Sequence, residues 1–311
     1  MADLRLLAAP LQGYTECEWR HAHTTVCDGA DEYITPFIRV EKGVVRNRDI
    51  RDISSHLNTG QHTVAQIIFK DTDEFCKGAD AAISAGYREI DMNLGCPFPP
   101  QVKHGRGAGM LKSPDKLAEI AGLIGSRYTG VSFSAKMRLG VADPNDWLDI
   151  IDIINDMPLR RVCLHPRIAV QQYGGKPDMD AFNQFAAASA HPMVYNGDIR
   201  TLADIDSIAR LTVVSGIMVG RGLLGRPTLF AEWREGTEWS LARRGEALIE
   251  IHNSIYDEYA GRLCGDNQLL MKIKPYWDFA EDTIGHRAAK AIKKATTLAA
   301  YKAAVSKITF I

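Results

Sequence analysis

The chain has 311 residues and a mass of 34.4 kDa, a length that can bury a sizeable core without disulfide or metal support. Hydrophobic residues make up 46% and charged residues 24% of the sequence, which excludes a disordered or fibrous chain. The formal net charge is −1, from 37 basic and 38 acidic side chains. This balance excludes a wholly basic nucleic-acid coat but not a local basic patch.

Cysteine usage and the N-terminus indicate the cellular compartment. The six cysteines never form a C-x-x-C pair, and no apolar run approaches the roughly 20 residues that span a bilayer. The N-terminus lacks a basic region followed by an apolar core. We therefore expect a cytoplasmic protein with reduced thiols and without a membrane partner. We also expect a monomer that binds no metal.

Eight short apolar or β-branched runs recur along the first two thirds of the chain. They are residues 4–10, 32–37, 63–68, 89–94, 132–139, 161–165, 192–196 and 216–220. Helical candidates separate the later runs, at residues 73–85, 114–128, 146–155, 179–190 and 202–211. Alternating strands and helices indicate parallel pairing, and eight such runs favour a closed (β/α)8 TIM barrel over a six-stranded open sheet. Helix signals are poor after the first two runs.

The pattern changes to helix only after about residue 240. The expected helices cover residues 241–262, 269–281 and 286–306. The sequence therefore predicts an α/β fold with a barrel over residues 1–240 and an all-helical C-terminal domain over residues 241–311.

Polar residues gather where the expected strands end, the face on which barrels of this kind build their active sites. In chain order these are Ala9-Pro10-Leu11-Gln12-Gly13, Gln66, Asn93-Leu94-Gly95-Cys96-Pro97, Lys136 with Arg138, His165 with Arg167, Asn196-Gly197-Asp198 and Gly220-Arg221-Gly222. Cations, amides and a thiol on one rim suit an anionic, planar, polar ligand. The two glycine-containing motifs of the last two strands are typical of a phosphate site.

Cys96 is the candidate for chemistry. A lone cysteine is usually a small buried hydrophobe, and we expect this of Cys27, Cys76, Cys163 and Cys264. Cys96 differs because it lies in a Gly-Cys-Pro turn near cations from neighbouring strands, a setting that suits an acid or a nucleophile. Lys136 and Arg138 share one strand face, and cations facing the barrel interior need an anion or a water-filled mouth.

Taken together, these motifs closely resemble the tRNA-dihydrouridine synthase family from residue 8 to about residue 230. The resemblance implies an FMN-containing (β/α)8 barrel followed by a helical domain, which reduces selected uridines of tRNA using NADPH. It also implies that Pro10, Leu11 and Gln12 approach the flavin through their backbone. Gln66 and Lys136 would hydrogen-bond the isoalloxazine beside His165, and the ribityl phosphate would be held by Asn196, Gly197, Asp198, Gly220 and Arg221.

The same resemblance assigns the substrate side of the site. Asn93 would contact the flipped-out uracil, and Cys96 would donate a proton to carbon 5 while hydride from reduced flavin adds to carbon 6. The segment Ile38-Arg39-Val40 is similar to the branch acting on the 5′ side of the D-loop, where Arg39 would touch tRNA. Two departures from the family pattern stand out: Pro166 between His165 and Arg167, and Leu11 in the first motif.

A basic patch fits a tRNA substrate. Residues 283–311 contain six basic residues and no Asp or Glu. Helical spacing places four of these cations on one broad face, and two lysines on the preceding helix add to the charge. We expect the tRNA to be contacted by Arg138, Arg167, Lys272, Lys274, Arg287, Lys290, Lys293 and Lys294.

Two alternatives remain. A small-molecule FMN oxidoreductase of the dihydroorotate dehydrogenase type would share the barrel, but it would not need the helical domain or the basic patch. A non-catalytic tRNA-binding barrel would not need the combination of Cys96, Lys136 and Arg221.

Overall fold

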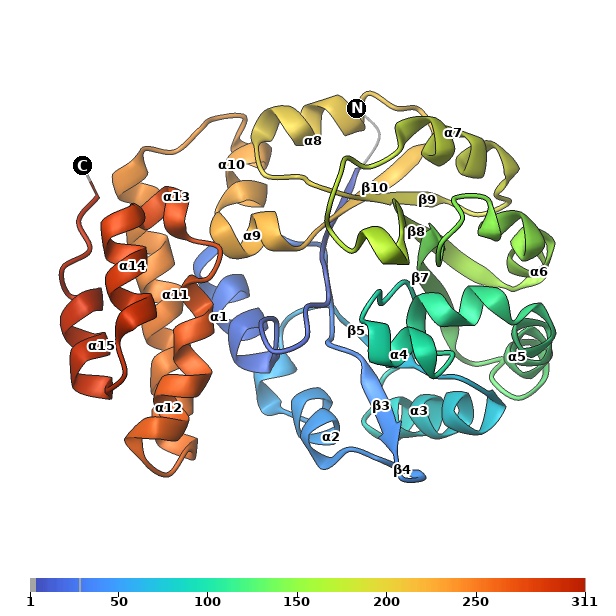
Figure 1. Cartoon of the computed structure of the whole chain (residues 1–311), viewed down its shortest axis with the longest axis horizontal. Helices are drawn as coiled ribbons and strands as arrows, with labels where there is room; N and C mark the ends of the chain where they lie inside the picture. The colour runs from blue at the N-terminus through green and yellow to red at the C-terminus, as the bar shows by residue number, and fades with distance from the viewer. Residues whose placement is uncertain (1–3, 28, 311) are drawn as a thin grey trace.

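Eight parallel strands close into a barrel in the computed structural model, which describes residues 4–27 and 29–310. Figure 1 shows the strands enclosed by helices. The strands are β1 (Arg5–Ala8), β2 (Glu32–Ile34), β5 (Thr63–Ile68), β6 (Glu89–Leu94), β7 (Ser132–Gly140), β8 (Leu159–Ile168), β9 (Met193–Asn196) and β10 (Val214–Val219). Pairing of β2 with β5 and of β1 with β10 closes the ring. All eight expected runs form strands, so the barrel prediction is confirmed.

The second strand continues into a hairpin that we did not predict. After Ile34 the chain leaves the sheet and rejoins it as β3 (Ile38–Glu41), which pairs in parallel with the upper part of β5. A tight turn then leads to β4 (Val44–Val45), antiparallel to β3. This hairpin raises Arg39 at the C-terminal end of the barrel.

Helices surround the strands. Those of the barrel are α1 (Cys17–Cys27), α2 (Asn47–Ile53), α3 (Thr72–Ser84), α4 (Pro99–Lys103), α5 (Pro114–Ser126), α6 (Ile151–Asp156), α7 (Met179–Ala188), α8 (Leu202–Ala209), α9 (Arg221–Gly225) and α10 (Leu229–Glu235). The expected helix over residues 146–155 is a 3-10 turn at Asp146–Asp149 followed by α6. Helices α1 and α2 occupy the positions where the sequence signal was poor.

The C-terminal region is helical, as predicted, but more broken. It contains α11 (Leu241–Arg262), α12 (Asp266–Ile273), α13 (Glu281–Ile284), α14 (His286–Lys294) and α15 (Leu298–Val305). The predicted helix 269–281 fails at a 3-10 turn that contains Pro275, because proline lacks the N–H that an α-helix needs there. The predicted helix 286–306 is interrupted because the Thr297 side chain accepts a hydrogen bond from the Ala300 N–H and so begins a new helix.

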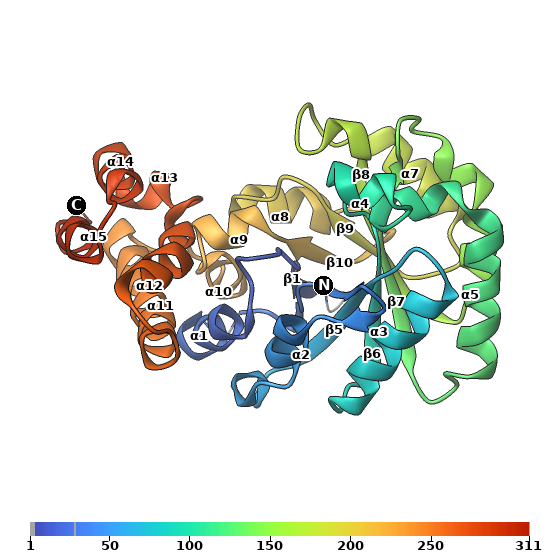
Figure 2. The same cartoon turned by 60° about the horizontal axis from the view of Figure 1, so that its bottom comes forward.

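These helices lie against one flank of the barrel, where α11 packs on α1 (Figure 2). Leu248 and Ile251 of α11 belong to the same buried apolar cluster as Leu6 of β1. Helix α11 begins where we placed the domain boundary, but the core continues across it, so the division into two domains stays a prediction. Within the described ranges 4–27 and 29–310, the helices are too short or too polar to cross a bilayer.

A buried carboxylate closes the N-terminal end of the barrel. Glu32 begins β2, its side chain is 2% exposed, and it accepts two hydrogen bonds of 2.7 and 2.6 Å from the Arg161 guanidinium. Arg160 adds a third contact of 2.7 Å. Burial alone would raise the pKa of Glu32, but the hydrogen bonds and charges of Arg161 and Arg160 lower it to about 2.

We predict that Glu32→Gln lowers the free energy of unfolding by about 3–5 kcal/mol at pH 7, because it leaves buried guanidinium groups without their counter-charge. The pKa of Glu32 is lower in the folded than in the unfolded chain, so its contribution is complete above the unfolded value and is lost as pH falls from about 4.5 toward 2. Urea unfolding between pH 7 and pH 3 measures both effects.

The matched control is Asp73→Asn, which breaks an ion pair with Lys77 in which both side chains are exposed, and which should change stability by under about 1 kcal/mol. Equal stabilities of the two variants would contradict the role given to Glu32.

Candidate functional site

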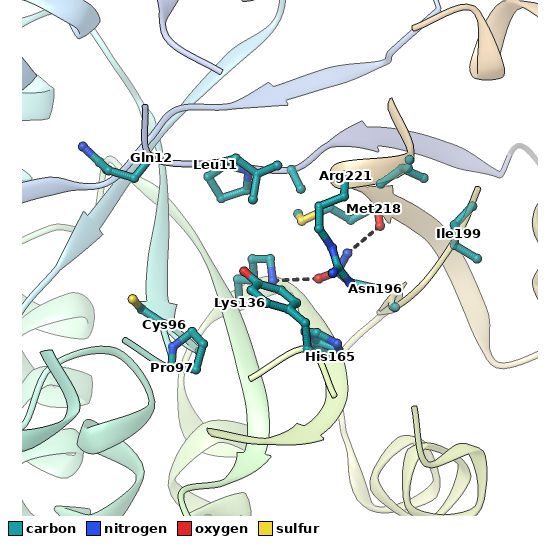
Figure 3. A pocket seen from close by; sticks show the side chains of 18 of the residues that line it. Leu11, Gln12, Cys96, Pro97, Lys136, His165, Asn196, Ile199, Met218 and Arg221 are labelled. Atoms are coloured by element: carbon teal, nitrogen blue, oxygen red, sulfur yellow. Dashed lines mark hydrogen bonds between the residues drawn. The ribbon is translucent and has the colours of Figure 1, made fainter. Parts of the chain in front are cut away.

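A cavity of about 280 Å³ opens at the C-terminal ends of the strands. Figure 3 shows side chains from loops far apart in sequence converging there. Thirteen of the residues predicted for the site line it: Pro10, Leu11, Gln12, Asn93, Cys96, Lys136, Arg138, His165, Asn196, Gly197, Asp198, Gly220 and Arg221. The structure therefore brings the strand-end motifs together around one space.

Lys136 lies at the centre of the cavity (Figure 3). Its Nζ donates to Asn196 Oδ1 at 2.8 Å, and Asn196 Nδ2 in turn donates to the Met218 carbonyl at 2.7 Å. These two hydrogen bonds fix the orientation of the Asn196 amide and leave further Lys136 protons for a ligand. Burial lowers the pKa of Lys136, so the ammonium gains from any anion or carbonyl that enters.

The lining carries an excess of positive charge. The four cations are Lys136, Arg138, Arg200 and Arg221, and among the described lining residues Asp198 supplies the only carboxylate. Burial lowers the pKa of Arg138 to about 10, and its guanidinium is held by the Gly95 and Ile168 carbonyls at 3.0 and 3.1 Å. Neutral acceptors do not cancel these charges, so the cavity is built for an anionic ligand.

His165 is a neutral hydrogen-bond donor. Burial, together with the charges of Arg138 and Lys136, holds the pKa of His165 well below its usual value. Arg167 Nη1 lies 3.0 Å from His165 Nε2, and a guanidinium can only donate, so Nε2 accepts and the ring proton lies on Nδ1. Arg167 itself does not line the cavity: it is 1% exposed and also pairs with Asp198. With Pro166 between them, the side chains of His165 and Arg167 are still held in place by hydrogen bonds.

Asn93 builds the turn that presents Cys96. Its Oδ1 accepts from the Gly95 and Cys96 N–H groups at 3.2 and 2.8 Å, and its Nδ2 donates to Gln66 Oε1 at 2.8 Å. Gly107 has a φ of +58° and lies against the turn, where a Cβ would come within 2.7 Å of Cys96 Cβ. The Cys96 backbone is thus fixed from both sides.

The Cys96 thiol keeps its proton at neutral pH. Burial raises the pKa of Cys96, while the Phe98 N–H and the charges of Arg138, Lys136 and Arg39 lower it by less. A protonated thiol with cations nearby can donate a proton and then carry the resulting negative charge.

Gln66 and Arg39, like Arg167, lie outside the cavity lining. Gln66 is fully buried, and its Nε2 donates to Asp91 Oδ2 at 2.8 Å, so it supports Asn93 from below. Arg39 lies on the hairpin, paired with Glu41 at 3.0 Å, and is close enough to influence Cys96. The flavin contact expected of Gln66 and the tRNA contact expected of Arg39 both stay predictions.

One corner of the cavity suits a phosphate. Gly222 lies so close to the preceding loop that a Cβ would come within 1.9 Å of the Ile199 carbonyl oxygen. Gly197 is almost as restricted, because a Cβ there would lie 2.9 Å from the Tyr195 hydroxyl. Arg200 and Arg221 border the same loops, and exposed backbone amides with adjacent guanidinium groups bind phosphate oxygens.

The loop after β1 offers limited backbone donors. Pro10 has no N–H, and the Leu11 N–H already donates to Thr15 Oγ1 at 2.9 Å. Of the three residues expected to meet the flavin through their backbone, only Gln12 has an N–H without an acceptor in the described part of the chain.

Sequence reasoning missed several lining residues. They include Tyr14, Phe37, Tyr173, Ile199, Arg200 and Met218. The Tyr173 ring covers the Arg221 guanidinium, whose carbon lies 4.1 Å from the ring centre. Arg200 follows Asp198 by two residues, so extending that motif would have found it. The positions of the aromatic residues depend on loop geometry and had no comparable signal.

The segment after β1 contacts the C-terminal helices. The Tyr14 hydroxyl donates to Asp278 Oδ2 at 3.0 Å, and its ring meets Phe279 edge-on. Lys272 pairs with Glu16, and Lys274 Nζ donates to the Ala295 carbonyl at 2.9 Å. The two predicted tRNA-binding lysines therefore already have partners within the protein.

The remaining basic residues divide between two clefts. Lys290 and Lys293 line one of about 350 Å³ together with Asp278, so this cleft adjoins the cavity through the Tyr14–Asp278 contact. Arg287 and Lys294 line a groove of about 750 Å³ between α14 and α15. The four cations of α14 therefore lie on two sides of the helix and do not form one surface.

Two groups of potential metal ligands lie elsewhere in the described chain. They are Cys17, Glu18 and Asp52, and Glu32, His62 and Glu89. Each group already has arginine partners on its carboxylates, so a cation would have to compete with them.

Comparison with known proteins agrees with this geometry. A family model described as dihydrouridine synthase (Dus) matches residues 6–303. The tRNA-dihydrouridine(16) synthase of Cupriavidus necator is 28% identical over 81% of this chain and 83% of its own length. A probable tRNA-dihydrouridine synthase of Aquifex aeolicus is 25% identical over 83% of this chain and 81% of its own.

The fold alone also matches a solved histamine dehydrogenase from Rhizobium sp. 4-9, with a TM-score of 0.55 and 11% identity. That match covers 81% of this chain, which spans about half (49%) of the length of the dehydrogenase. With its barrel, its strand-end site and a family match over nearly the whole sequence, the chain belongs to the dihydrouridine synthase family.

Proposed function

We propose that this protein is a tRNA-dihydrouridine synthase that reduces uridine 16 in the D-loop of tRNA. The observation that carries the proposal is the half-buried Cys96 thiol at a cavity whose lining holds four cations and one carboxylate. Family membership supports the reaction. The position is supported by the Cupriavidus necator relative and by others whose names specify uridine 16. The monomeric state and the cytoplasmic location stay predictions.

The donor set fits FMN. Arg200, Arg221 and the glycine-framed loops offer a phosphate site, and Lys136 with His165 Nδ1 offers donors to a ring rich in carbonyl and imine acceptors. When bound, FMN supplies the hydride that adds to carbon 6 of the uracil, and we propose NADPH as the source of its electrons. The excess cationic charge of the lining would also favour the electron-rich, reduced form of this cofactor.

Cys96 supplies the proton for carbon 5. The proton leaves the Cys96 sulfur as the carbon 5–carbon 6 double bond is reduced, and the thiolate left behind is stabilised by Arg138, Lys136 and Arg39. Asn93 keeps the sulfur in place through its contacts with the turn, and its amide can still offer one proton to the uracil.

We predict that Cys96→Ala keeps about one FMN per chain and binds tRNA, but forms dihydrouridine at least ~100-fold more slowly, because it lacks the general acid. Flavin absorbance and quantification of dihydrouridine in unmodified tRNA supplied with NADPH provide the two measurements. Cys264→Ala is the control and should keep full activity, because this thiol is exposed rather than buried as we expected from the sequence.

A colourless wild-type protein that FMN cannot reconstitute would contradict the cofactor proposal. Full turnover by Cys96→Ala would contradict the proton-donor role while leaving the flavin site intact.

The tRNA backbone would lie across the cleft that adjoins the cavity. Lys290 and Lys293 share this cleft, whereas Arg287 and Lys294 line the groove on the other side of α14. Phosphate contacts made by lysines give affinity and orientation without sequence information. Because this cleft adjoins the cavity through the Tyr14–Asp278 contact, we expect a strand whose uridine enters the cavity to meet Lys290 and Lys293 before it meets Arg287 and Lys294.

The test compares two double charge reversals. Lys290→Glu with Lys293→Glu should weaken tRNA binding about 10-fold or more and lower the slope of log Kd against log salt by about 2, because two phosphate contacts are lost. Arg287→Glu with Lys294→Glu changes the same charge on the same helix and should have a smaller effect. Equal salt slopes for the two variants would show that the cleft does not select the strand path.

A further inference from the structure

Phe98 exposes an aromatic ring next to the catalytic cysteine. It follows Cys96 by two residues, and 58% of its surface is accessible. Most aromatic side chains of this protein are buried, including Phe69, Phe75 and Phe133, each at 0% exposure. Single exposed apolar side chains are common on protein surfaces, so it is the position of Phe98 beside the Cys96 turn, rather than its exposure alone, that points to binding.

The backbone holds this ring in a rigid frame. Pro97 precedes Phe98, and Pro99 and Pro100 follow it. Phe98 has an extended conformation, with φ −62° and ψ 118°, as expected before a proline. Its carbonyl accepts hydrogen bonds from the Gln101 and Val102 N–H groups at 2.8 and 3.1 Å. Little backbone freedom therefore remains to be lost when a ligand meets the ring.

The ring lies at the rim of the cavity rather than inside it. Cys96 and Pro97 line the cavity, but Phe98 does not, even though its backbone N–H points at the Cys96 sulfur. A base that reaches the sulfur therefore leaves its neighbour in the strand near the rim, outside the cavity.

The other exposed aromatic at the mouth is already occupied. Tyr173 is 46% exposed, but its ring lies over Arg221 at 4.1 Å and near Arg138 at 5.6 Å. Within the described part of the chain, Phe98 has no aromatic or guanidinium partner of this kind. Phe98 is therefore a well-exposed ring at this mouth with a face available to a base.

We propose that Phe98 is a stacking platform for the nucleobase next to the uridine that enters the cavity. The proposal rests on the function proposed above. Extruding the target base breaks its stacking on both neighbours, and the exposed phenyl ring replaces one of those contacts. Cations around the cavity attract the intervening phosphates, so an RNA strand fits this rim better than an uncharged peptide does.

The experiment uses the FMN-loaded full-length protein with unmodified tRNA. Phe98→Ala should lower kcat/KM for tRNA and the affinity for tRNA by about 10-fold to 100-fold, the effect of one lost base–aromatic stack. Phe98→Trp should retain both values, and Phe98→Leu, which is apolar but not aromatic, should resemble the alanine variant. In Phe98→Trp, tRNA should quench tryptophan fluorescence beyond the quenching seen in the wild-type protein.

Two controls separate stacking from damage to the site. Reduction of the bound flavin by NADPH in the absence of tRNA should be unchanged in all three variants. Leu148→Ala removes another exposed apolar side chain, 55% accessible and outside the cavity lining, and should leave tRNA binding unaltered.

Wild-type tRNA affinity and kcat/KM in Phe98→Ala would overturn the stacking proposal while the proposed function stood. A change in sedimentation of Phe98→Ala with unaltered tRNA affinity would overturn it in favour of a protein–protein contact. A wild-type protein that forms no dihydrouridine would refute the proposed function and the stacking proposal with it.

Discussion

The burial of several cations in the mouth of one barrel is the constraint on which the site depends. Lys136 and Arg138 project from β7 into a space where burial lowers the pKa of each. Asp198 offsets part of this charge through Arg167 and Arg221. The remaining excess has to be compensated by a ligand, because unpaired buried charges cost far more than neutral groups. At the opposite end, Glu32 and Arg161 compensate each other, so that end is closed by protein alone.

The chemistry proposed for Cys96 follows from the same balance of burial and charge. Burial keeps the thiol protonated, and the nearby cations lower the cost of the thiolate without forming it in advance. Asn93 connects this residue to the interior, because the amide that fixes the cysteine turn also bonds Gln66 and, through it, Asp91. A polar network inside the barrel thereby sets the position of one sulfur atom at its mouth.

Sequence patterns predicted the barrel well because each strand is a short apolar or β-branched run and the site lies where those runs end. The hairpin β3–β4 was missed because Ile38–Glu41 resumes pairing after a break that looks like a loop. Pro275 and Thr297 interrupt two long predicted helices, and both breaks could have been predicted from these residues alone. The places of Tyr14 and Tyr173 in the cavity lining could not be predicted in this way, since they depend on how loops fold over the barrel. Likewise, helical spacing grouped the basic residues of α14, but packing against the 3-10 turn at Lys274–Trp277 and against α15 divides them between two clefts.

The most direct test of the account is to map dihydrouridine, position by position, in tRNA from cells that lack this gene. Mass spectrometry of digested tRNA should show loss of dihydrouridine at position 16, restored by the wild-type gene and not by one encoding Cys96→Ala. Dihydrouridine that is unchanged at every position, in cells without another member of the family, would contradict the proposed reaction. Loss at a different position would retain the reaction and refute the assignment to uridine 16.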